Sequence, residues 1–102
     1  LPAGVEGPVR VLGTRSAWAL YTVLVEDRDR IRESLAARGV GTGLFYRVPL
    51  HRHPAFAEHL SGTERLPVAE SLAERVLSLP MGPDLTDEEV ERVVDALADA
   101  VA

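Results

Sequence analysis

The residues best suited to binding chemistry lie together in the stretch from Val40 to His51. Its second half places two aromatic rings, a guanidinium and an imidazole close together, at Phe45, Tyr46, Arg47 and His51. A tyrosine hydroxyl and a guanidinium at the end of a strand can hold a sugar, a phosphate or a carboxylate. Neighbouring strand residues point to opposite faces, so one ring can pack inward while the other points elsewhere. We therefore expect these four residues to contact a small molecule; the alternative is a core aromatic beside a surface arginine.

Three histidines follow in and after this stretch, at positions 51, 53 and 59, with Glu58 as a candidate fourth ligand for a metal. Zinc sites use histidine and carboxylate ligands. The spacing of these residues matches no strong metal-binding pattern, and Pro54 interrupts it. We expect loop histidines bonded to backbone or water, and no metal site.

Other chemistry is disfavoured by the residues present. The alternating glycines at 39, 41 and 43 form no G-x-G-x-x-G fingerprint, and no helix starts directly after them, so we expect close backbone packing in a strand. No serine lies in a nucleophile elbow. All 11 basic residues are arginine, so no lysine Schiff base can form within this chain. The chain has no cysteine, which excludes disulfides and thiolate sites.

The bulk composition is that of one globular domain. The 102 residues are 46% apolar and 26% charged. The net charge of −5 disfavours nucleic acid, and no apolar run approaches the roughly 18 residues of a membrane helix. No signal peptide is evident. Residue 1 is Leu and the only methionine is Met81, so we expect the chain to be a piece of a longer product.

The first half predicts a strand, a helix and a second strand. Residues 1–15 are rich in Gly and Pro and read as a linker, with a short strand at 9–12. A strand is expected over 16–25. Both of its faces are apolar, so we expect a cover on each side, one of them a domain outside this chain. A helix capped by Asp27 should run to Arg38, with Gly39 just past its end, before a second strand over 40–46.

The second half predicts two further helices and a short strand. Residues 47–66 read as a loop with one helical turn over 54–60. Pro67 suits the first turn of a helix. A strand over 77–79 should stop at Pro80, and Thr86 with Glu89 makes a capping box for a last helix. That helix has an apolar stripe of Val90, Val93, Val94, Leu97 and Val101. The predicted fold is a two-layer α/β (α+β) domain, with a small, mostly antiparallel sheet and helices on one face.

Six short motifs then point to a known family. They are Ser16-Ala17-Trp18-Ala19-Leu20-Tyr21-Thr22, Arg28-Asp29, Gly39-Val40-Gly41-Thr42-Gly43, Tyr46-Arg47-Val48-Pro49-Leu50-His51, Leu77-Ser78-Leu79-Pro80-Met81 and Leu85-Thr86-Asp87-Glu88-Glu89-Val90. In this order they resemble the C-terminal small domain of the DegT/DnrJ/StrS family, over residues 16–102. These are pyridoxal-phosphate-dependent aminotransferases that act on nucleotide-linked keto-sugars and similar rings. Residues 1–15 would then be the linker from a missing N-terminal domain.

The resemblance implies a fold-type-I aminotransferase in which a missing large domain holds pyridoxal phosphate and its Schiff-base lysine. The small domain closes over the substrate, the enzyme is a cytoplasmic homodimer, and the amino donor is usually glutamate. This chain alone would bind no cofactor and would be inactive. In the family, His-Tyr-Pro often precedes the Pro-Leu-His near the sugar substrate. Here Tyr46 and His51 match, whereas Phe45 replaces the histidine and Arg47 the proline. This difference suggests another substrate, with an anionic group facing Arg47.

The rival hypothesis is a stand-alone α/β ligand-binding or regulatory module that uses the loop over 40–51 as its site. Such a module should be monodisperse and expose little hydrophobic surface. An excised domain should self-associate or bind a hydrophobic dye.

Overall fold

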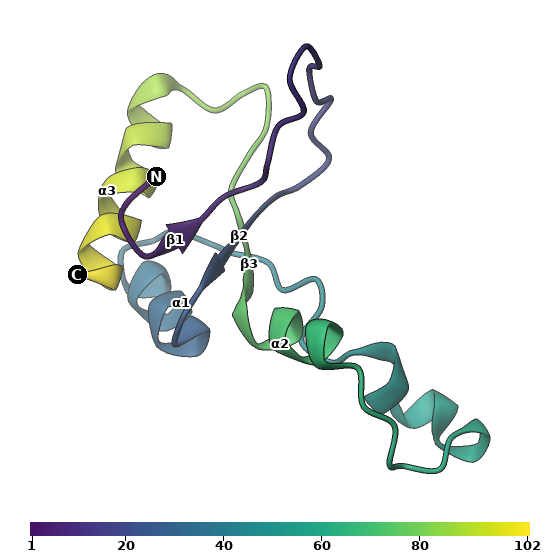
Figure 1. The fold of residues 1–102 in the computed structure, drawn as a ribbon. Helices are drawn as coiled ribbons and strands as arrows, with labels where there is room; N and C mark the ends of the chain where they lie inside the picture. Colours follow the sequence, from purple (N-terminus) through teal and green to yellow (C-terminus); the bar gives the residue numbers. More distant parts are fainter.

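The computed structural model describes all residues 1–102 and contains a three-stranded sheet with helices packed against it (Figure 1). The elements in chain order are β1 (Val5–Glu6), β2 (Tyr21–Val25), α1 (Arg28–Ala37), the 3-10 helices η1 (Leu50–Arg52) and η2 (Pro54–His59), α2 (Pro67–Arg75), β3 (Val76–Leu79) and α3 (Asp87–Val101). The sheet order is β1-β2-β3 and both pairings are antiparallel. The predicted fold class, a small antiparallel sheet with helices, is confirmed.

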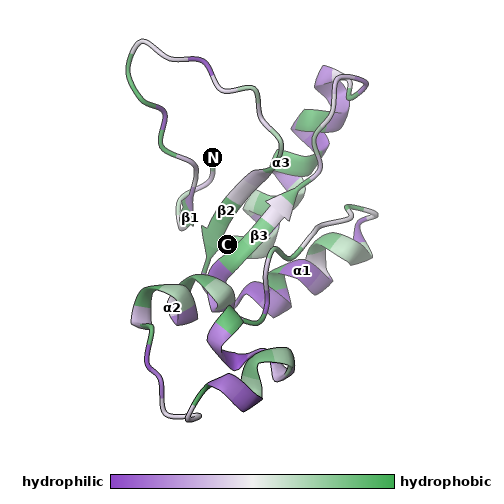
Figure 2. Ribbon diagram, turned by 90° about the vertical axis from the view of Figure 1, so that its right-hand side faces the viewer, coloured by the Kyte–Doolittle hydropathy of each residue, from purple (hydrophilic) through white to green (hydrophobic).

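Strand β2 is central because it pairs with both of the other strands. Val5 lies opposite Val25, and Val23 lies opposite Leu77. Apart from Leu24, the residues of β2 are β-branched or aromatic, which are the types that favour strands. Figure 2 shows apolar residues along β2 and β3.

The hydrophobic core lies between one face of this sheet and the pair α1 and α3. Its fully enclosed side chains are Val23, Val25, Ile31, Leu35, Leu77 and Leu97. The opposite face of β2 is only half-buried at Thr22 and Leu24. There the hydroxyl groups of Thr22 and Ser78 share a hydrogen bond of 2.8 Å. The helices of this chain therefore cover one face of the sheet fully. The second face, for which the sequence also predicts a cover, is only partly covered by this chain.

Helix α1 begins and ends where the sequence predicts, but its N-cap residue makes no side-chain capping bond. Gly39 adopts a φ of +77°, and the amide of Val40 donates to the carbonyl of Leu35 at 2.9 Å, which closes a Schellman motif. Asp27 occupies the N-cap position, but its side chain makes no capping bond. Its carboxylate instead accepts a hydrogen bond of 2.8 Å from Nε of Arg30.

Helix α3 starts at the predicted cap, since the Thr86 hydroxyl accepts from the amide of Glu89 at 3.1 Å. Its buried face matches the predicted stripe only in part, since Leu97 is enclosed and Val93 and Val101 pack against the core. Ala96, Leu97 and Ala100 are buried, whereas Val90 and Val94 are 46% and 38% exposed. The small alanines allow close approach to α1, which the larger valines would prevent.

Two predicted strands and one predicted boundary are corrected by the structure. The range 9–12 forms no strand; β1 forms earlier, inside the predicted linker 1–15. The predicted strand over 16–25 begins only at Tyr21, after a left-handed φ of 46° at Trp18. The predicted strand over 40–46 is reduced to a single bridge between Gly43 and Ser78, because the chain turns away directly afterwards. The turn over 54–60, α2 from Pro67 and β3 ending at Leu79 agree with prediction.

Residues 48–66 form an arm that extends from the sheet and helix body (Figure 1). As whole residues all of them are at least partly exposed, although the side chain of His51 is sheltered. The radius of gyration is 15.8 Å, compared with about 13 Å for a compact domain of this length. The arm contributes to this difference together with the extended segment between β1 and β2 (Figure 1), and it carries η1 and η2 away from the core. No helix of the structure has the length and apolar character needed to cross a membrane.

Candidate functional site

The loop that carries the predicted binding residues is fixed to the sheet at Gly43. The amide of Gly43 donates to the carbonyl of Ser78 at 3.0 Å, and the amide of Ser78 donates back at 2.9 Å. A Cβ atom at position 43 would lie 2.6 Å from Cε2 of Phe45. A side chain at position 43 would therefore force the ring of Phe45, which folds back over the Cα of Gly43, to move.

The two aromatic rings lie edge to face at the start of the loop. The ring centroids of Phe45 and Tyr46 are 5.5 Å apart, with an interplanar angle of 84°. Such a T-shaped pair is a favoured aromatic geometry. Tyr46 is 73% exposed and Phe45 44%. Both rings are therefore exposed, and the expected inward packing of one of them is not observed.

Arg47 faces a carboxylate of its own chain. Its Nη2 lies 3.3 Å from Oδ1 of Asp29, and its Nη1 lies 3.4 Å from Oδ2. The hydrogen bond donated by Arg28, together with the charges of Arg28 and Arg47, lowers the pKa of Asp29 against the opposing effect of burial, so Asp29 is a carboxylate at neutral pH. The long distances and half-exposed side chains make this a weak, exchangeable pair.

His51 is held inside the loop. Its side chain is 6% exposed, and its Nε2 lies 2.9 Å from Oε1 of Glu70. The same Glu70 oxygen accepts from Nη2 of Arg52 at 2.8 Å. The hydrogen bond from His51, followed by those from Arg52, lowers the pKa of Glu70 against the opposing effect of burial.

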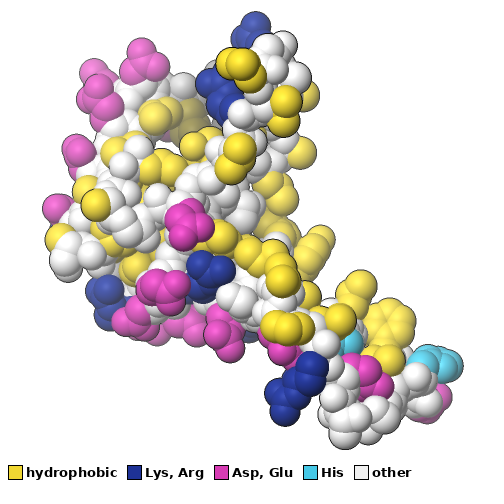
Figure 3. All heavy atoms as spheres, viewed as in Figure 1, with side chains coloured by type: hydrophobic (Ala, Val, Ile, Leu, Met, Phe, Trp, Pro, Cys, Tyr) yellow, Lys and Arg dark blue, Asp and Glu magenta, His cyan; other side chains and the backbone are white.

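All four predicted site residues line one groove between the loop and α2. Its volume is about 780 Å³, and its lining is largely apolar. The residues from Phe45 to His51 form one wall, and Leu66, Ala69, Leu72, Ala73 and Val76 contribute the other. Figure 3 shows apolar side chains beside the histidines on this part of the molecule. An apolar groove with a hydroxyl, a guanidinium and an imidazole at its margin suits an organic ligand with a few polar groups.

The three histidines do not converge. His53 accepts a hydrogen bond from the amide of Ala55 at 3.3 Å and stacks edge to face on Phe56. No group of three or more His, Cys, Asp or Glu side chains in the structure could hold a metal ion.

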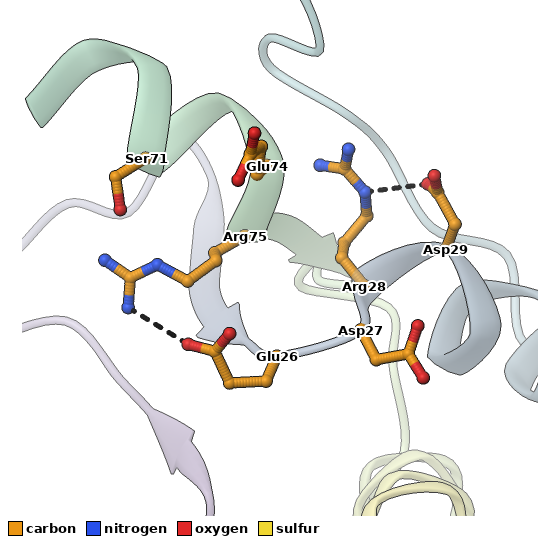
Figure 4. Close-up of a pocket in the computed structure, with 7 residues that line it drawn as sticks. All are labelled: Glu26, Asp27, Arg28, Asp29, Ser71, Glu74 and Arg75. Atoms are coloured by element: carbon orange, nitrogen blue, oxygen red, sulfur yellow. Dashed lines mark hydrogen bonds and ion pairs between the residues drawn. The ribbon is translucent and has the colours of Figure 1, made fainter. Parts of the chain in front are cut away.

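A second, charged pocket of about 450 Å³ lies where α1 begins and α2 ends (Figure 4). It contains Arg28 and Arg75 together with four carboxylates, and Figure 4 shows the guanidinium of Arg28 turned to Asp29. Arg75 pairs with Glu26 at 3.7 Å. Because carboxylates outnumber guanidinium groups, this pocket favours neither an anion nor an apolar ligand.

A third groove of about 1000 Å³ runs beneath the segment before β2, and we call it the Trp18 groove. Its lining includes Trp18, Tyr21, Met81, Val90 and Val94, and no carboxylate. The rings of Trp18 and Tyr21 are 5.2 Å apart. The groove is open and mainly apolar, which is the surface character of a region that packs against other protein.

Sequence reasoning missed the residues that fix the loop. Asp29 and Glu70 lie 18 and 19 positions from their partners Arg47 and His51. A helix-start motif at Arg28-Asp29 was visible, but nothing in the spacing indicated that Asp29 would meet Arg47. Glu70 resembles any solvated helix carboxylate in sequence.

The same arrangement of sheet, helices and loop is found in solved structures of aminotransferases. The crystal structure of DesV from Streptomyces venezuelae, in complex with a ketimine intermediate, matches with a TM-score of 0.86 and 44% identity, over 94% of this chain and 26% of that chain. A model of the DegT/DnrJ/EryC1/StrS aminotransferase family matches residues 3–98. The chain belongs to this family and corresponds to its C-terminal region. The predicted resemblance is confirmed.

Two other relatives indicate the chemistry found in the family. A dTDP-3-amino-3,4,6-trideoxy-alpha-D-glucose transaminase from Streptomyces venezuelae is 45% identical over 94 residues, which is 92% of this chain and 25% of the relative. NtdA from Bacillus subtilis, solved with the bound cofactor PMP, matches with a TM-score of 0.82 and 28% identity, over 97% of this chain and 23% of that chain. The chain thus spans about a quarter of the length of the relatives that it matches.

The residues present here do not form a site for such a cofactor by themselves. The chain contains no lysine, because its 11 basic residues are all arginine. The arginines nearest the loop are already engaged: Arg28 and Arg47 with Asp29, and Arg52 with Glu70. Each of these arginines already contacts a carboxylate, so the chain offers no preformed site for a cofactor phosphate.

Proposed function

We propose that this chain is the C-terminal, substrate-side domain of a pyridoxal-phosphate-dependent aminotransferase acting on a nucleotide-linked keto-sugar. The observation that carries the proposal is the 45% identity to a transaminase named for a dTDP-linked amino sugar, over 92% of this chain. The groove beside Tyr46 and Arg47 supports the substrate role. The cofactor serves as the electron sink, and it would be held by residues outside this chain.

The proposed assembly is a cytoplasmic homodimer, with a large domain that binds the cofactor and glutamate as the amino donor. In it, the loop residues Phe45, Tyr46, Arg47 and His51 face the sugar substrate. Tyr46 offers its exposed hydroxyl to a sugar oxygen. Arg47 exchanges Asp29 for an anionic group of the substrate, which the weak pairing of these two residues permits. His51 shapes the loop. The isolated chain has no transaminase activity in this proposal.

The first test is an absorbance spectrum of the full gene product before and after borohydride reduction. A yellow protein whose colour becomes covalently attached to a lysine outside these residues supports the proposal. A colourless product that stays colourless when pyridoxal phosphate is added overturns it.

The second test addresses the loop. In the full gene product, Tyr46→Phe and Arg47→Ala should weaken use of the nucleotide sugar more than they weaken cofactor binding. Val68→Ala is the control, since Val68 is 73% exposed and does not line the groove. Equal losses in substrate use and cofactor binding would contradict the assignment of these residues to the substrate.

A further inference from the structure

The loop between Arg47 and Arg52 is attached to α2 at its far end by a single carboxylate. Oε1 of Glu70 lies 2.9 Å from Nε2 of His51 and 2.8 Å from Nη2 of Arg52. Glu70 stands in the first turn of α2, the helix that forms the wall of the groove facing the loop. One side chain therefore fixes two consecutive residues of the loop.

The near end of the loop is also connected to α2, through two successive side-chain contacts. Arg47 pairs with Asp29, and Oδ1 of Asp29 accepts from Nε of Arg28 at 2.9 Å. Nη1 of Arg28 then donates to the carbonyl of Ala73 at 2.8 Å and to that of Val76 at 3.0 Å. Both ends of the loop are thus connected to α2, at its start and at its end, and the groove lies between the two connections.

The two connections differ in strength. The Arg47–Asp29 pair is 3.3 Å long at its shortest, and both side chains are about half exposed. At the other end, the side chain of Glu70 is 26% exposed and that of His51 only 6%. Solvent competes strongly with exposed ion pairs and less with sheltered ones. The Glu70 end is therefore the firmer of the two.

The ring of His51 has no second polar contact. Its buried Nδ1 has no hydrogen-bond partner in the structure. Glu70 is ionised and only accepts, so Nε2 of His51 is the donor between them. The orientation of this buried ring is consequently set by one hydrogen bond, the one to Glu70.

We propose that Glu70 is a positioning residue, which holds the Pro49–His53 turn so that Phe45 and Tyr46 stay at the margin of the groove. Glu70 acts through His51 and Arg52 and does not itself touch the substrate. The link from this turn to substrate binding rests on the function proposed above, whereas the clamp on the turn stands independently of it.

Amide hydrogen exchange of the 102-residue chain tests the clamp directly. The amides of Arg52 and His53 donate to the carbonyls of Pro49 and Leu50 at 2.9 and 3.1 Å, so their protection reports whether the turn is closed. Glu70→Ala should lower this protection about tenfold, the effect of losing a charge-assisted hydrogen bond. Glu70→Gln keeps an acceptor and should lie between Glu70→Ala and wild type.

The matched control is Glu74→Ala, because Glu74 is an exposed carboxylate one turn later on α2 and forms no ion pair. Exchange at Leu97 should be the same in all variants, which verifies that the core is intact. Equal protection of Arg52 and His53 in the Glu70 and Glu74 variants would overturn the clamp. If Glu70→Ala does not fold, the protection of Arg52 and His53 in Glu70→Gln is compared with that in Glu74→Ala, and equal protection again overturns the clamp.

Kinetics of the full gene product then test the positioning role. Glu70→Ala should raise KM for the nucleotide sugar about tenfold with a smaller change in kcat, and Glu74→Ala should change neither. An open turn with an unchanged KM would overturn the positioning role. If the wild-type protein turns over no nucleotide sugar, the proposed function fails, and the exchange data still decide whether Glu70 clamps the turn.

Discussion

The guanidinium of Arg28 donates a hydrogen bond of 2.8 Å to the carbonyl oxygen of Ala73 near the end of α2. Arg28 is only 5% exposed, so its charge is almost removed from water. The cost of this burial is offset by three acceptors: the carbonyls of Ala73 and Val76 and the carboxylate of Asp29. The last carbonyls of a helix have no hydrogen-bond donors within the helix, and here Arg28 of α1 provides the donors.

Replacing Arg28 should destabilise the fold strongly. Arg28→Met keeps much of the side-chain volume but leaves two buried carbonyl oxygens without a donor. We expect the free energy of unfolding to fall by about 2 to 3 kcal/mol, measured by urea denaturation. Arg32→Met is the matched control, because Arg32 is exposed on the same helix and forms no ion pair. Equal stability of the two variants would contradict the structural role of Arg28.

A side chain at position 43 should destabilise the fold while Phe45 is present. In Gly43→Ala the new methyl group would meet the ring of Phe45 at 2.6 Å, so the ring must move. Overpacking of this kind costs about 1 to 3 kcal/mol, measurable by urea denaturation.

Two companion variants make this prediction specific. Gly41→Ala should be nearly neutral, since nothing lies within 4 Å of a Cβ there. The double variant with Gly43→Ala and Phe45→Leu should recover part of the loss. If Gly41→Ala and Gly43→Ala are equally stable, the close approach of Phe45 to Gly43 does not exist in solution.

The turn at Ser61–Glu64 should loosen in acid. The amide of Ser61 donates to the carboxylate of Glu64 at 2.7 Å, followed by the Ser61 hydroxyl at 2.8 Å and the amide of Gly62 at 3.0 Å. Led by the Ser61 amide, these bonds lower the pKa of Glu64 from 4.5 to about 2. The ionised form is the one stabilised, so the turn is ordered above pH 4.5 and loses this contribution as the pH falls toward 2.

An NMR titration of the Glu64 carboxyl carbon and the Gly62 amide checks this prediction. Both signals should move together, with a midpoint well below 4.5. In Glu64→Gln the Gly62 amide should no longer respond to pH in this range. A midpoint at 4.5 in the wild-type chain would show that the carboxylate is free of the Ser61 and Gly62 donors.

The Trp18 groove should bind a hydrophobic dye in the 102-residue chain. Val94 lines this groove and is 38% exposed. Val94→Glu should reduce dye fluorescence by about half and weaken self-association in sedimentation experiments. Val68→Glu, on α2 and outside the groove, is the control. A wild-type chain that is monodisperse and binds no dye would instead favour a stand-alone module.

The helices could be predicted from sequence because local signals determine their ends. Thr86 caps α3, Gly39 closes α1 and Pro67 starts α2, each through chemistry within a few residues. The prediction of a strand over 40–46 was wrong, because β-propensity does not determine where the pairing between strands ends. Only Gly43 meets β3 before the loop turns toward α2.

The sequence placed the four candidate residues near one another, but it did not indicate the side chains that hold them in place. Phe45, Tyr46, Arg47 and His51 do line one groove, and adjacency in sequence was enough to suggest it. Asp29 and Glu70 come from helices that the fold brings to the loop. Such contacts depend on tertiary structure, and no local pattern encodes them.

The arm has a consequence for how the chain withstands cleavage. A protease that cuts between residues 53 and 66 severs a segment without buried residues, which is where nicking concentrates. The two pieces would remain joined, because β2 pairs with β3 and α1 packs on α3 across the cut, and these contacts include the core. The nicked protein should therefore elute as one species and separate only in denaturant, and the two fragments should reassociate when mixed.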